Sequence, residues 1–146
     1  MILKESKGDL FRLDEKYALA HCISLDCKMG AGIALQFDKR FKGMKSYLKR
    51  CVAENNLKDP CVIPYSDNDR LIFNLITKEK YWHKPTYETI EATIEDMAFM
   101  CKTYKIKYLA MPYIGCGLDR LQWGQVKSLI EKHFNDLDIE IQIKYI

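Results

Sequence analysis

Short apolar runs alternate with amphipathic runs along the whole chain, and this alternation constrains the fold more than any other feature. Apolar residues spaced by three and four predict helices, whereas short apolar segments between turn residues predict strands. We expect strands at 1–3, 18–23, 61–65, 71–76, 107–111 and 139–146, and helices at 32–41, 44–53, 85–104 and 122–134. The order β-β-α-α-β-β-α-β-α-β predicts an α/β fold, a mixed sheet of about six strands between helices in three α/β/α layers.

The composition is that of an ordinary globular domain. Apolar residues make up 48% and charged residues 29% of the 146 residues, which argues against a disordered, collagen-like or coiled-coil chain. No linker, repeat or low-complexity tract interrupts the sequence. A chain of this length buries enough surface to fold without a metal or disulfide. We therefore expect a single domain over residues 1–146.

The charge balance is mildly basic, with a formal net charge of +3. This net charge is compatible with a phosphate-bearing ligand, but the sequence lacks the long basic stripe that is typical of nucleic-acid-binding proteins. The lysine-rich segment 39–50 is the nearest candidate for such a stripe. Apolar residues alternate with its charges, so we interpret it as a solvated helix face.

The six cysteines are expected to be free thiols. No secretory-type apolar segment precedes them and no run is long enough to cross a bilayer, which predicts a reducing, cytoplasmic location (or a nuclear one in a eukaryote) and no membrane partner. His21, Cys22 and Cys27 are candidates for zinc ligands. The spacing of the two cysteines differs from the common zinc knuckle and no second pair follows, so we assign no metal and no cofactor.

Two glycine-bearing loops, 24–33 and 112–119, each leave a predicted strand and enter a predicted helix. Ligands of open α/β sheets bind beyond the carboxyl ends of strands, where both loops would lie. Gly30 and Gly32 allow close approach of a backbone, and the helix that follows offers unpaired N–H groups to a phosphate. Either loop alone also fits a plain turn. Gly115 and Gly117 repeat the pattern, however, and two such loops together could hold a diphosphate.

Three charged residues are candidates for chemistry, each with a plainer alternative. Lys78 ends an apolar strand, where it is either a solvated lysine or an amine nucleophile. Asp119 precedes a predicted helix, where it either caps that helix or transfers protons. Asp9 either caps a turn or accepts a hydrogen bond from an exocyclic amine. The pattern alone leaves these alternatives open.

Five motifs together resemble those of the macrodomain family, specifically its terminal ADP-ribose protein glycohydrolase branch. They are KGDLF (7–11), AHCIS-DC-MGAGIA (20–34), LITK (75–78), HKPTYE (83–88) and MP-IGCGLDRLQW (111–123). The resemblance covers nearly the whole chain. The glycine loops are shared by macrodomains broadly, whereas LITK, HKPTYE and GCGLDRLQW are more specific to this branch.

The resemblance implies an ADP-ribose site and a role for each matching residue. Lys78 matches the family nucleophile and Asp119 the catalytic acid/base. The substrate-binding matches are Asp9 and Leu10 at the adenine, His21, Ser24, Gly30, Gly32 and Ile33 at the first loop, Tyr113, Ile114, Gly115, Cys116, Gly117 and Leu118 at the phosphates and distal ribose, and Ile146 beside the adenosine. Tyr113 stands where an arginine is familiar, which removes a cation near the phosphates.

The activity implied by the resemblance is hydrolysis of terminal ADP-ribose from modified acidic side chains. Nothing in the sequence demands more than a monomer, so we expect a monomeric enzyme. O-acetyl-ADP-ribose and ADP-ribosylated nucleic acid are further substrates in the same branch. The alternatives are a module that binds ADP-ribose without turnover and an ADP-ribose 1″-phosphate phosphatase. The presence of both Lys78 and Asp119 favours the hydrolase, since a binding module needs neither.

Overall fold

The computed structural model describes residues 1–146 and contains one six-stranded sheet with helices on both faces. Its strands are β1 (Ile2–Lys7), β2 (Ala18–Ser24), β3 (Cys61–Asp67), β4 (Arg70–Lys78), β5 (Tyr108–Met111) and β6 (Glu140–Tyr145). Its helices are α1 (Gly32–Arg40), α2 (Met44–Glu54), α3 (Tyr87–Thr103) and α4 (Trp123–Phe134), with a short 3-10 turn at Leu10–Arg12. The predicted α/β/α architecture is confirmed.

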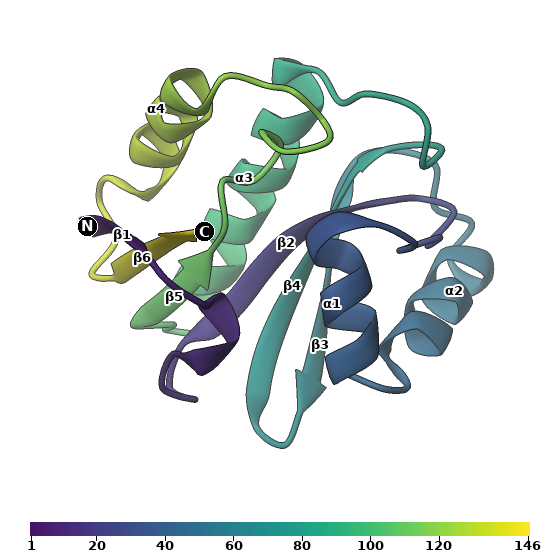
Figure 1. The fold of residues 1–146 in the computed structure, drawn as a ribbon, viewed down its shortest axis with the longest axis horizontal. Coiled ribbons are helices and arrows are strands. Elements are labelled where there is room, and N and C mark those ends of the chain that lie inside the picture. Colours follow the sequence, from purple (N-terminus) through teal and green to yellow (C-terminus); the bar gives the residue numbers. More distant parts are fainter.

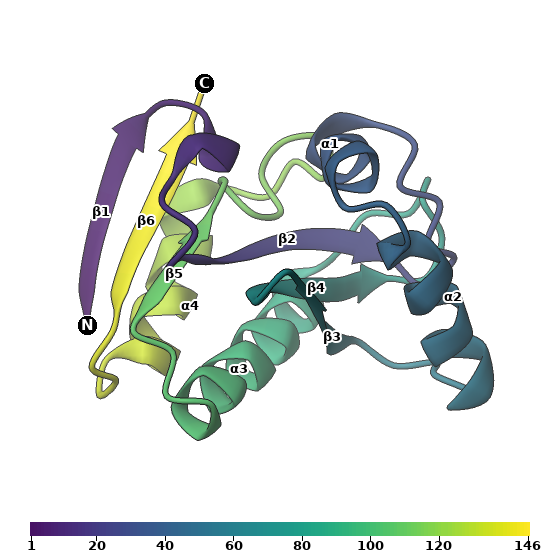
Figure 2. The same ribbon diagram turned by 90° about the horizontal axis from the view of Figure 1, so that it is seen from below.

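The strand order across the sheet is β1-β6-β5-β2-β4-β3. Every neighbouring pair is parallel except β3 and β4, which form an antiparallel hairpin. Five strands therefore point the same way, and their carboxyl ends meet at one edge of the sheet. Segments that are distant in sequence meet at that edge, because β1 and β6 lie side by side although they belong to opposite ends of the chain (Figure 2).

Each face of the sheet carries its own hydrophobic core. Helices α3 and α4 cover one face and α1 and α2 cover the other (Figures 1 and 2). Phe73, Ile94 and Phe134 are fully buried under α3 and α4, while Phe37 and Leu48 are fully buried on the α1 and α2 side. The apolar residues of β2 and β4 alternate between the two cores. Because both faces of these strands are buried, their sequences are nearly continuous apolar runs.

The ends of several elements differ from the sequence prediction. Helix α3 begins at Tyr87 rather than 85, because the Thr86 hydroxyl accepts the Thr89 N–H at 3.1 Å in a capping box. Strand β1 continues beyond Leu3 to Lys7, because it is an edge strand paired only with β6 and tolerates polar residues. No helix combines the length and apolarity needed to cross a membrane.

Candidate active site

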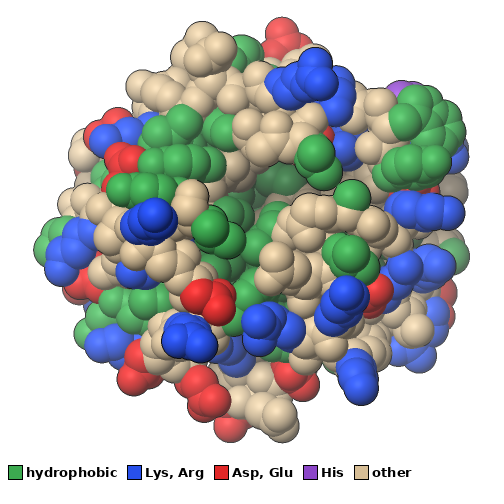
Figure 3. Space-filling view, viewed as in Figure 1, with side chains coloured by type: hydrophobic (Ala, Val, Ile, Leu, Met, Phe, Trp, Pro, Cys, Tyr) green, Lys and Arg blue, Asp and Glu red, His purple; other side chains and the backbone are tan.

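A cleft of about 1010 Å³ opens at the edge where the five parallel strands end. Its lining comes from the segments that follow β1, β2 and β5 and from the last residues of β4 and β6. The space-filling view shows this face hollowed near its centre, with hydrophobic side chains in the hollow (Figure 3). This is where the strand-end rule placed a ligand site.

Lys78 and Asp119 meet inside the cleft. Lys78 Nζ donates to Asp119 Oδ1 at 2.6 Å, and the two side chains are 13% and 14% exposed. Lys78 is the last residue of β4, and Asp119 lies in the loop between β5 and α4, 41 residues further on. The structure thus brings together an amine and a carboxylate that the sequence shows only separately.

The thiols near this pair are held in the protonated form. Burial and the negative charge of Asp119 raise the pKa of Cys22, and the same two causes raise the pKa of Cys116 to about 11. A thiolate is the nucleophilic form of cysteine, so neither thiol is activated for attack near neutral pH. Of the nucleophilic side chains in this part of the cleft, the Lys78 amine is therefore the better candidate.

The first glycine loop is anchored by two of its own buried side chains. Cys27 and Met29 adopt left-handed backbone conformations, with φ of 53° and 49°, and both side chains are buried in the α1 and α2 core. The hydroxyl of Ser24 donates to Asp26 at 2.5 Å. These contacts fix the loop and leave the backbone from Gly30 to Gly32 along the cleft wall.

The second glycine loop is held by the segment that precedes and begins α3. Lys84 Nζ donates to the carbonyl oxygen of Leu118 at 2.6 Å, and the Tyr87 hydroxyl accepts the Gln122 N–H at 3.0 Å. Gly115 has a φ of +73°, and a Cβ there would stand 2.5 Å from Ile90 Cδ1. The loop is therefore fixed over the cleft with its backbone against α3.

The opposite end of the cleft is aromatic and carries Asp9. The Asp9 carboxylate accepts the Phe11 N–H at 2.9 Å, so it caps the 3-10 turn while lining the cleft. The rings of Tyr113 and Tyr145 stack with centroids 5.4 Å apart and an interplanar angle of 10°. Both tyrosines and the exposed Ile146 line this end. A flat aromatic wall beside a carboxylate suits a purine base that carries an exocyclic amine.

His21 was predicted at the ligand, and the structure corrects this prediction. Its imidazole is fully buried, stacks on Phe37 at 3.8 Å and bonds Asn74 Oδ1 at 2.6 Å. Successive side chains of a strand point to opposite faces, so the neighbours of a residue at the cleft can face the core instead. Desolvation by burial lowers the pKa of His21 to about 4.

The other predicted site residues all line the cleft: Asp9, Leu10, Ser24, Gly30, Gly32, Ile33, Lys78, Tyr113, Ile114, Gly115, Cys116, Gly117, Leu118, Asp119 and Ile146. Their individual roles stay predictions. Sequence reasoning missed Lys84 and Tyr145 as lining residues. Lys84 stands within the HKPTYE motif, which was quoted for the resemblance and given no structural role.

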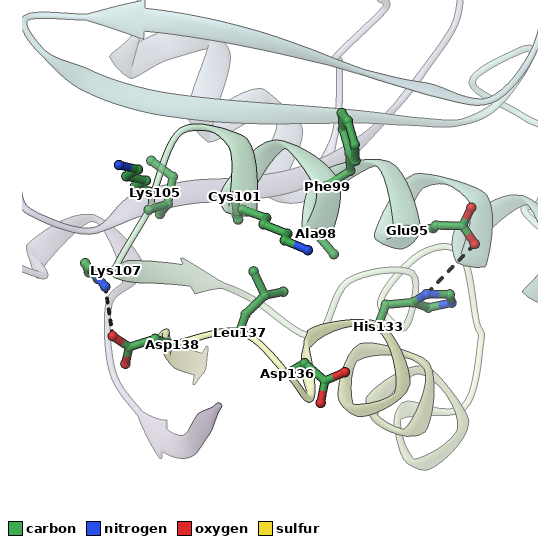
Figure 4. Close-up of a pocket in the computed structure, with 12 residues that line it drawn as sticks. Glu95, Ala98, Phe99, Cys101, Lys105, Lys107, His133, Asp136, Leu137 and Asp138 are labelled. Carbon is green, nitrogen blue, oxygen red and sulfur yellow. Dashed lines mark hydrogen bonds and ion pairs between the residues drawn. The ribbon is translucent and has the colours of Figure 1, made fainter.

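A second depression of about 420 Å³ lies between α3, α4 and the segments around β5 (Figure 4). Its ion pairs are peripheral, with Lys107 bonded to Asp138 at 2.8 Å and His133 3.9 Å from Glu95. The side chains of Lys107 and Asp138 are both more than half exposed. No nearly buried amine–carboxylate pair like that of the cleft occurs there. The cleft is therefore the candidate active site.

Comparisons with known proteins identify the family of the chain. The model of the Macro domain family matches residues 21–130. The chain is 44% identical over 137 residues to the human ADP-ribose glycohydrolase OARD1, covering 94% of this chain and 87% of that protein. It is 27% identical to the DNA ADP-ribosyl glycohydrolase of Thermus aquaticus, covering 94% of this chain and 39% of that protein. The solved macrodomain of Thermus aquaticus DarG superposes with a TM-score of 0.87, at 25% identity and 99% coverage of both chains.

Proposed function

The chain belongs to the Macro domain family, and from that premise we propose that it is an ADP-ribose glycohydrolase that releases ADP-ribose from modified acidic side chains. The observation that carries the proposal is the 2.6 Å contact between Lys78 and Asp119 inside the cleft. Two relatives named as glycohydrolases support it, one of them 44% identical to this chain.

The first step of the proposed reaction uses Lys78 as nucleophile. A proton passes from the lysine ammonium to Asp119 along their hydrogen bond, which frees the nitrogen lone pair. The nitrogen attacks the anomeric carbon of the distal ribose, and the bond from that carbon to the ester oxygen breaks. The electron pair of that bond leaves with the carboxylate, which takes the proton that Asp119 holds. ADP-ribose is then joined covalently to Lys78, and Asp119 is ionised again.

The second step returns the enzyme to its starting state. Asp119 takes a proton from water, and the hydroxide adds to the anomeric carbon as the carbon–nitrogen bond breaks. The lysine nitrogen keeps the bonding pair and takes from Asp119 the proton that came from water, so the ammonium and the carboxylate are restored. The products are free ADP-ribose and the unmodified carboxylic acid, and one water is consumed.

The two glycine loops supply the positioning. With the diphosphate held between Gly30–Gly32 and Gly115–Gly117, the distal ribose reaches Lys78 and the adenine reaches the Asp9 end. Fixing the reacting groups in this way lowers the barrier, by about 7 kcal/mol in favourable intramolecular reactions. A module that only binds ADP-ribose would use the same loops but would have no use for the paired amine and carboxylate.

The test compares wild type with Lys78→Ala on a glutamate-linked ADP-ribosylated peptide. We expect kcat/KM to fall by at least about a thousandfold, because the nucleophile is lost. The affinity for free ADP-ribose, measured by calorimetry, should change little, because the loops and the Asp9 end are intact. Lys39→Ala removes an exposed lysine of α1 and serves as the matched control.

Three results separate the alternatives. Full turnover by Lys78→Ala removes the lysine from the mechanism. Absence of turnover in the wild type, with ADP-ribose still bound, makes the protein a binding module. Release of phosphate from ADP-ribose 1″-phosphate by both proteins favours the phosphatase, which needs a directed water and no amine.

A further inference from the structure

One carboxylate outside the cleft binds three side chains. Glu5 lies on the edge strand β1. Its Oε1 atom accepts the Trp123 indole N–H at 3.0 Å and the Tyr113 hydroxyl at 3.3 Å, and its Oε2 atom lies 2.8 Å from Lys127 Nζ. Of these four residues Tyr113 alone lines the cleft. Tyr113 therefore connects Glu5 with any ligand that the cleft holds.

The fold explains why these donors converge on Glu5. Alternation along β1 places Glu5 on the same face as Leu3, which packs in the core under α3 and α4. Trp123 and Lys127 are four residues apart on α4 and lie on one side of that helix. Tyr113 follows β5, and β6 alone separates β5 from β1 in the sheet (Figure 2). Glu5 thus joins the edge of the sheet to the second glycine loop and to α4.

The protonation states fix the direction of these hydrogen bonds. The hydrogen bond from Lys127 is the largest cause that lowers the pKa of Glu5, and those from Trp123 and Tyr113 add to it against the opposing effect of burial. Desolvation and the charge of Glu5 raise the pKa of Tyr113. Near neutral pH the carboxylate is therefore an ionised acceptor and the phenol a donor. Hydrogen bonds to an ionised acceptor are stronger than neutral ones.

These hydrogen bonds hold an aromatic ring of the cleft wall. The Tyr113 ring contacts Trp123 at 4.6 Å and 39°, and it stacks on Tyr145 at 5.4 Å and 10°. Torsion of the terminal ring bond of a tyrosine is soft, so its orientation depends on what its face and its hydroxyl contact. Trp123 contacts the ring, and Glu5 binds the hydroxyl. Together they keep Tyr113 nearly parallel to Tyr145.

We propose that Glu5 is a positioning residue for substrate binding, which acts from outside the cleft by holding Tyr113 parallel to Tyr145. The proposal rests on the proposed function, in which adenine occupies the Asp9 end that these two rings line. Two parallel rings present flat surface to a base, and the strength of stacking depends on their orientation.

The position of Glu5 predicts an effect on binding and not on chemistry. Lys78 and Asp119 lie at the other end of the cleft and have no contact with Glu5. A carboxylate that only fastened β1 to α4 would behave differently, because its removal would lower stability and leave the KM of the folded enzyme unchanged.

The experiment measures kcat and KM of wild type and Glu5→Ala on the glutamate-linked ADP-ribosylated peptide. KM should rise by about fivefold to tenfold while kcat changes by less than about twofold. Glu5→Gln should keep a KM close to that of wild type, because the amide oxygen still accepts from Tyr113 and Trp123.

Competitive inhibition locates the effect at the base. In Glu5→Ala the inhibition constant of ADP, which carries adenine, should rise by the same factor as KM. That of ribose 5-phosphate, which lacks a base, should stay at the wild-type value. An equal rise for both inhibitors would overturn a role at the base.

Two further variants test the route through Tyr113. Tyr113→Phe removes the hydroxyl and keeps the ring, so it should raise KM as Glu5→Ala does. The double variant Glu5→Ala, Tyr113→Phe should be little worse than either single variant, because both remove the same hydrogen bond. The matched control is Lys4→Ala, which removes the 3.4 Å ion pair with Glu140 from the opposite face of β1 and should keep the wild-type KM.

The outcomes separate this proposal from the function on which it rests. A wild-type KM in folded Glu5→Ala, or a fall in kcat alone, overturns the positioning role and keeps the glycohydrolase. Full additivity in the double variant overturns the route through the Tyr113 hydroxyl. Should Glu5→Ala fail to fold, a wild-type KM in Tyr113→Phe overturns the proposal by itself. Absence of turnover in the wild type contradicts the proposed function, and the affinity of each variant for ADP, measured by calorimetry, then decides the role of Glu5.

Discussion

His21 shows how a single residue can look functional in the sequence and be structural in the fold. It stands beside the first glycine loop, yet its ring packs on Phe37 in the core. Asn74 donates its amide N–H to the Ile63 carbonyl at 3.1 Å, so its oxygen accepts from His21 Nε2. The imidazole is therefore neutral, with its Nδ1 atom unpartnered. The sequence alone did not show on which face of β2 each side chain lies.

Burial of neutral His21 makes the stability of the protein depend on pH. The pKa is lowered from 6.5 to about 4 by desolvation, so the unfolded chain binds the proton first as pH falls. The stabilising contribution is complete above pH 6.5 and is lost progressively towards pH 4, at most about 3 kcal/mol. We expect the free energy of unfolding of wild type to fall by about 2 kcal/mol from pH 7 to pH 5 through this residue.

His21→Gln is the variant that isolates this effect, because an amide keeps a hydrogen bond to Asn74 and does not titrate. Urea unfolding at several pH values should show a flatter pH dependence for His21→Gln than for wild type. Equal slopes between pH 7 and pH 5 would mean that the buried imidazole does not control acid stability.

At the scale of elements, the two glycine loops have different supports. The first loop is held by its own buried side chains, Cys27 and Met29. The second is tethered from outside by Lys84 and Tyr87. Both tethers come from the motif HKPTYE, which has no side chain at the reacting pair. The structure thus gives this motif a physical role, which is to hold the loop that carries Asp119.

Two glycines of the second loop should respond differently to alanine. Gly115→Ala places a Cβ 2.5 Å from Ile90 Cδ1 at a φ of +73°, so we expect a loss of about 1–3 kcal/mol in the free energy of unfolding. A Cβ at Gly117 would meet nothing within 4 Å, and that residue has no positive φ. Gly117→Ala should therefore change stability by less than about 0.5 kcal/mol. Equal melting temperatures for the two variants would show that the loop is not packed against α3.

The order and type of the regular elements were predictable because apolar periodicity reports burial directly. The helix and strand cores matched, while ends such as Thr86 and Lys7 depended on a cap and on an edge position. The 3-10 turn at Leu10–Arg12 was not predicted, since three residues carry no periodicity. Cleft-lining residues were predictable where a strand end and a glycine marked them. The tether from Lys84 and the stacked Tyr145 depend on tertiary contacts that no local pattern contains.

At the scale of the whole molecule, the parallel strands bring residues that are far apart in the sequence together at one edge of the sheet. Residues near both ends of the chain meet across β1 and β6, and two separate segments between them supply Lys78 and Asp119. Neither of these two residues is distinguished locally from other strand-end lysines or helix-entry aspartates. Their meeting in one cleft, nearly buried, is what gives the pair its proposed chemistry.

The most direct test of the paired mechanism is intact-mass spectrometry of Asp119→Ala incubated with an ADP-ribosylated peptide. Without Asp119 the Lys78 ammonium loses its proton only to solvent, which slows the first step, and the second step lacks the base that activates water. The covalent intermediate should therefore accumulate slowly, and a peptide map should place one ADP-ribose unit on Lys78. The double variant Lys78→Ala, Asp119→Ala should carry none. If Asp119→Ala shows no adduct at any time while turnover is lost, the covalent route through Lys78 is contradicted.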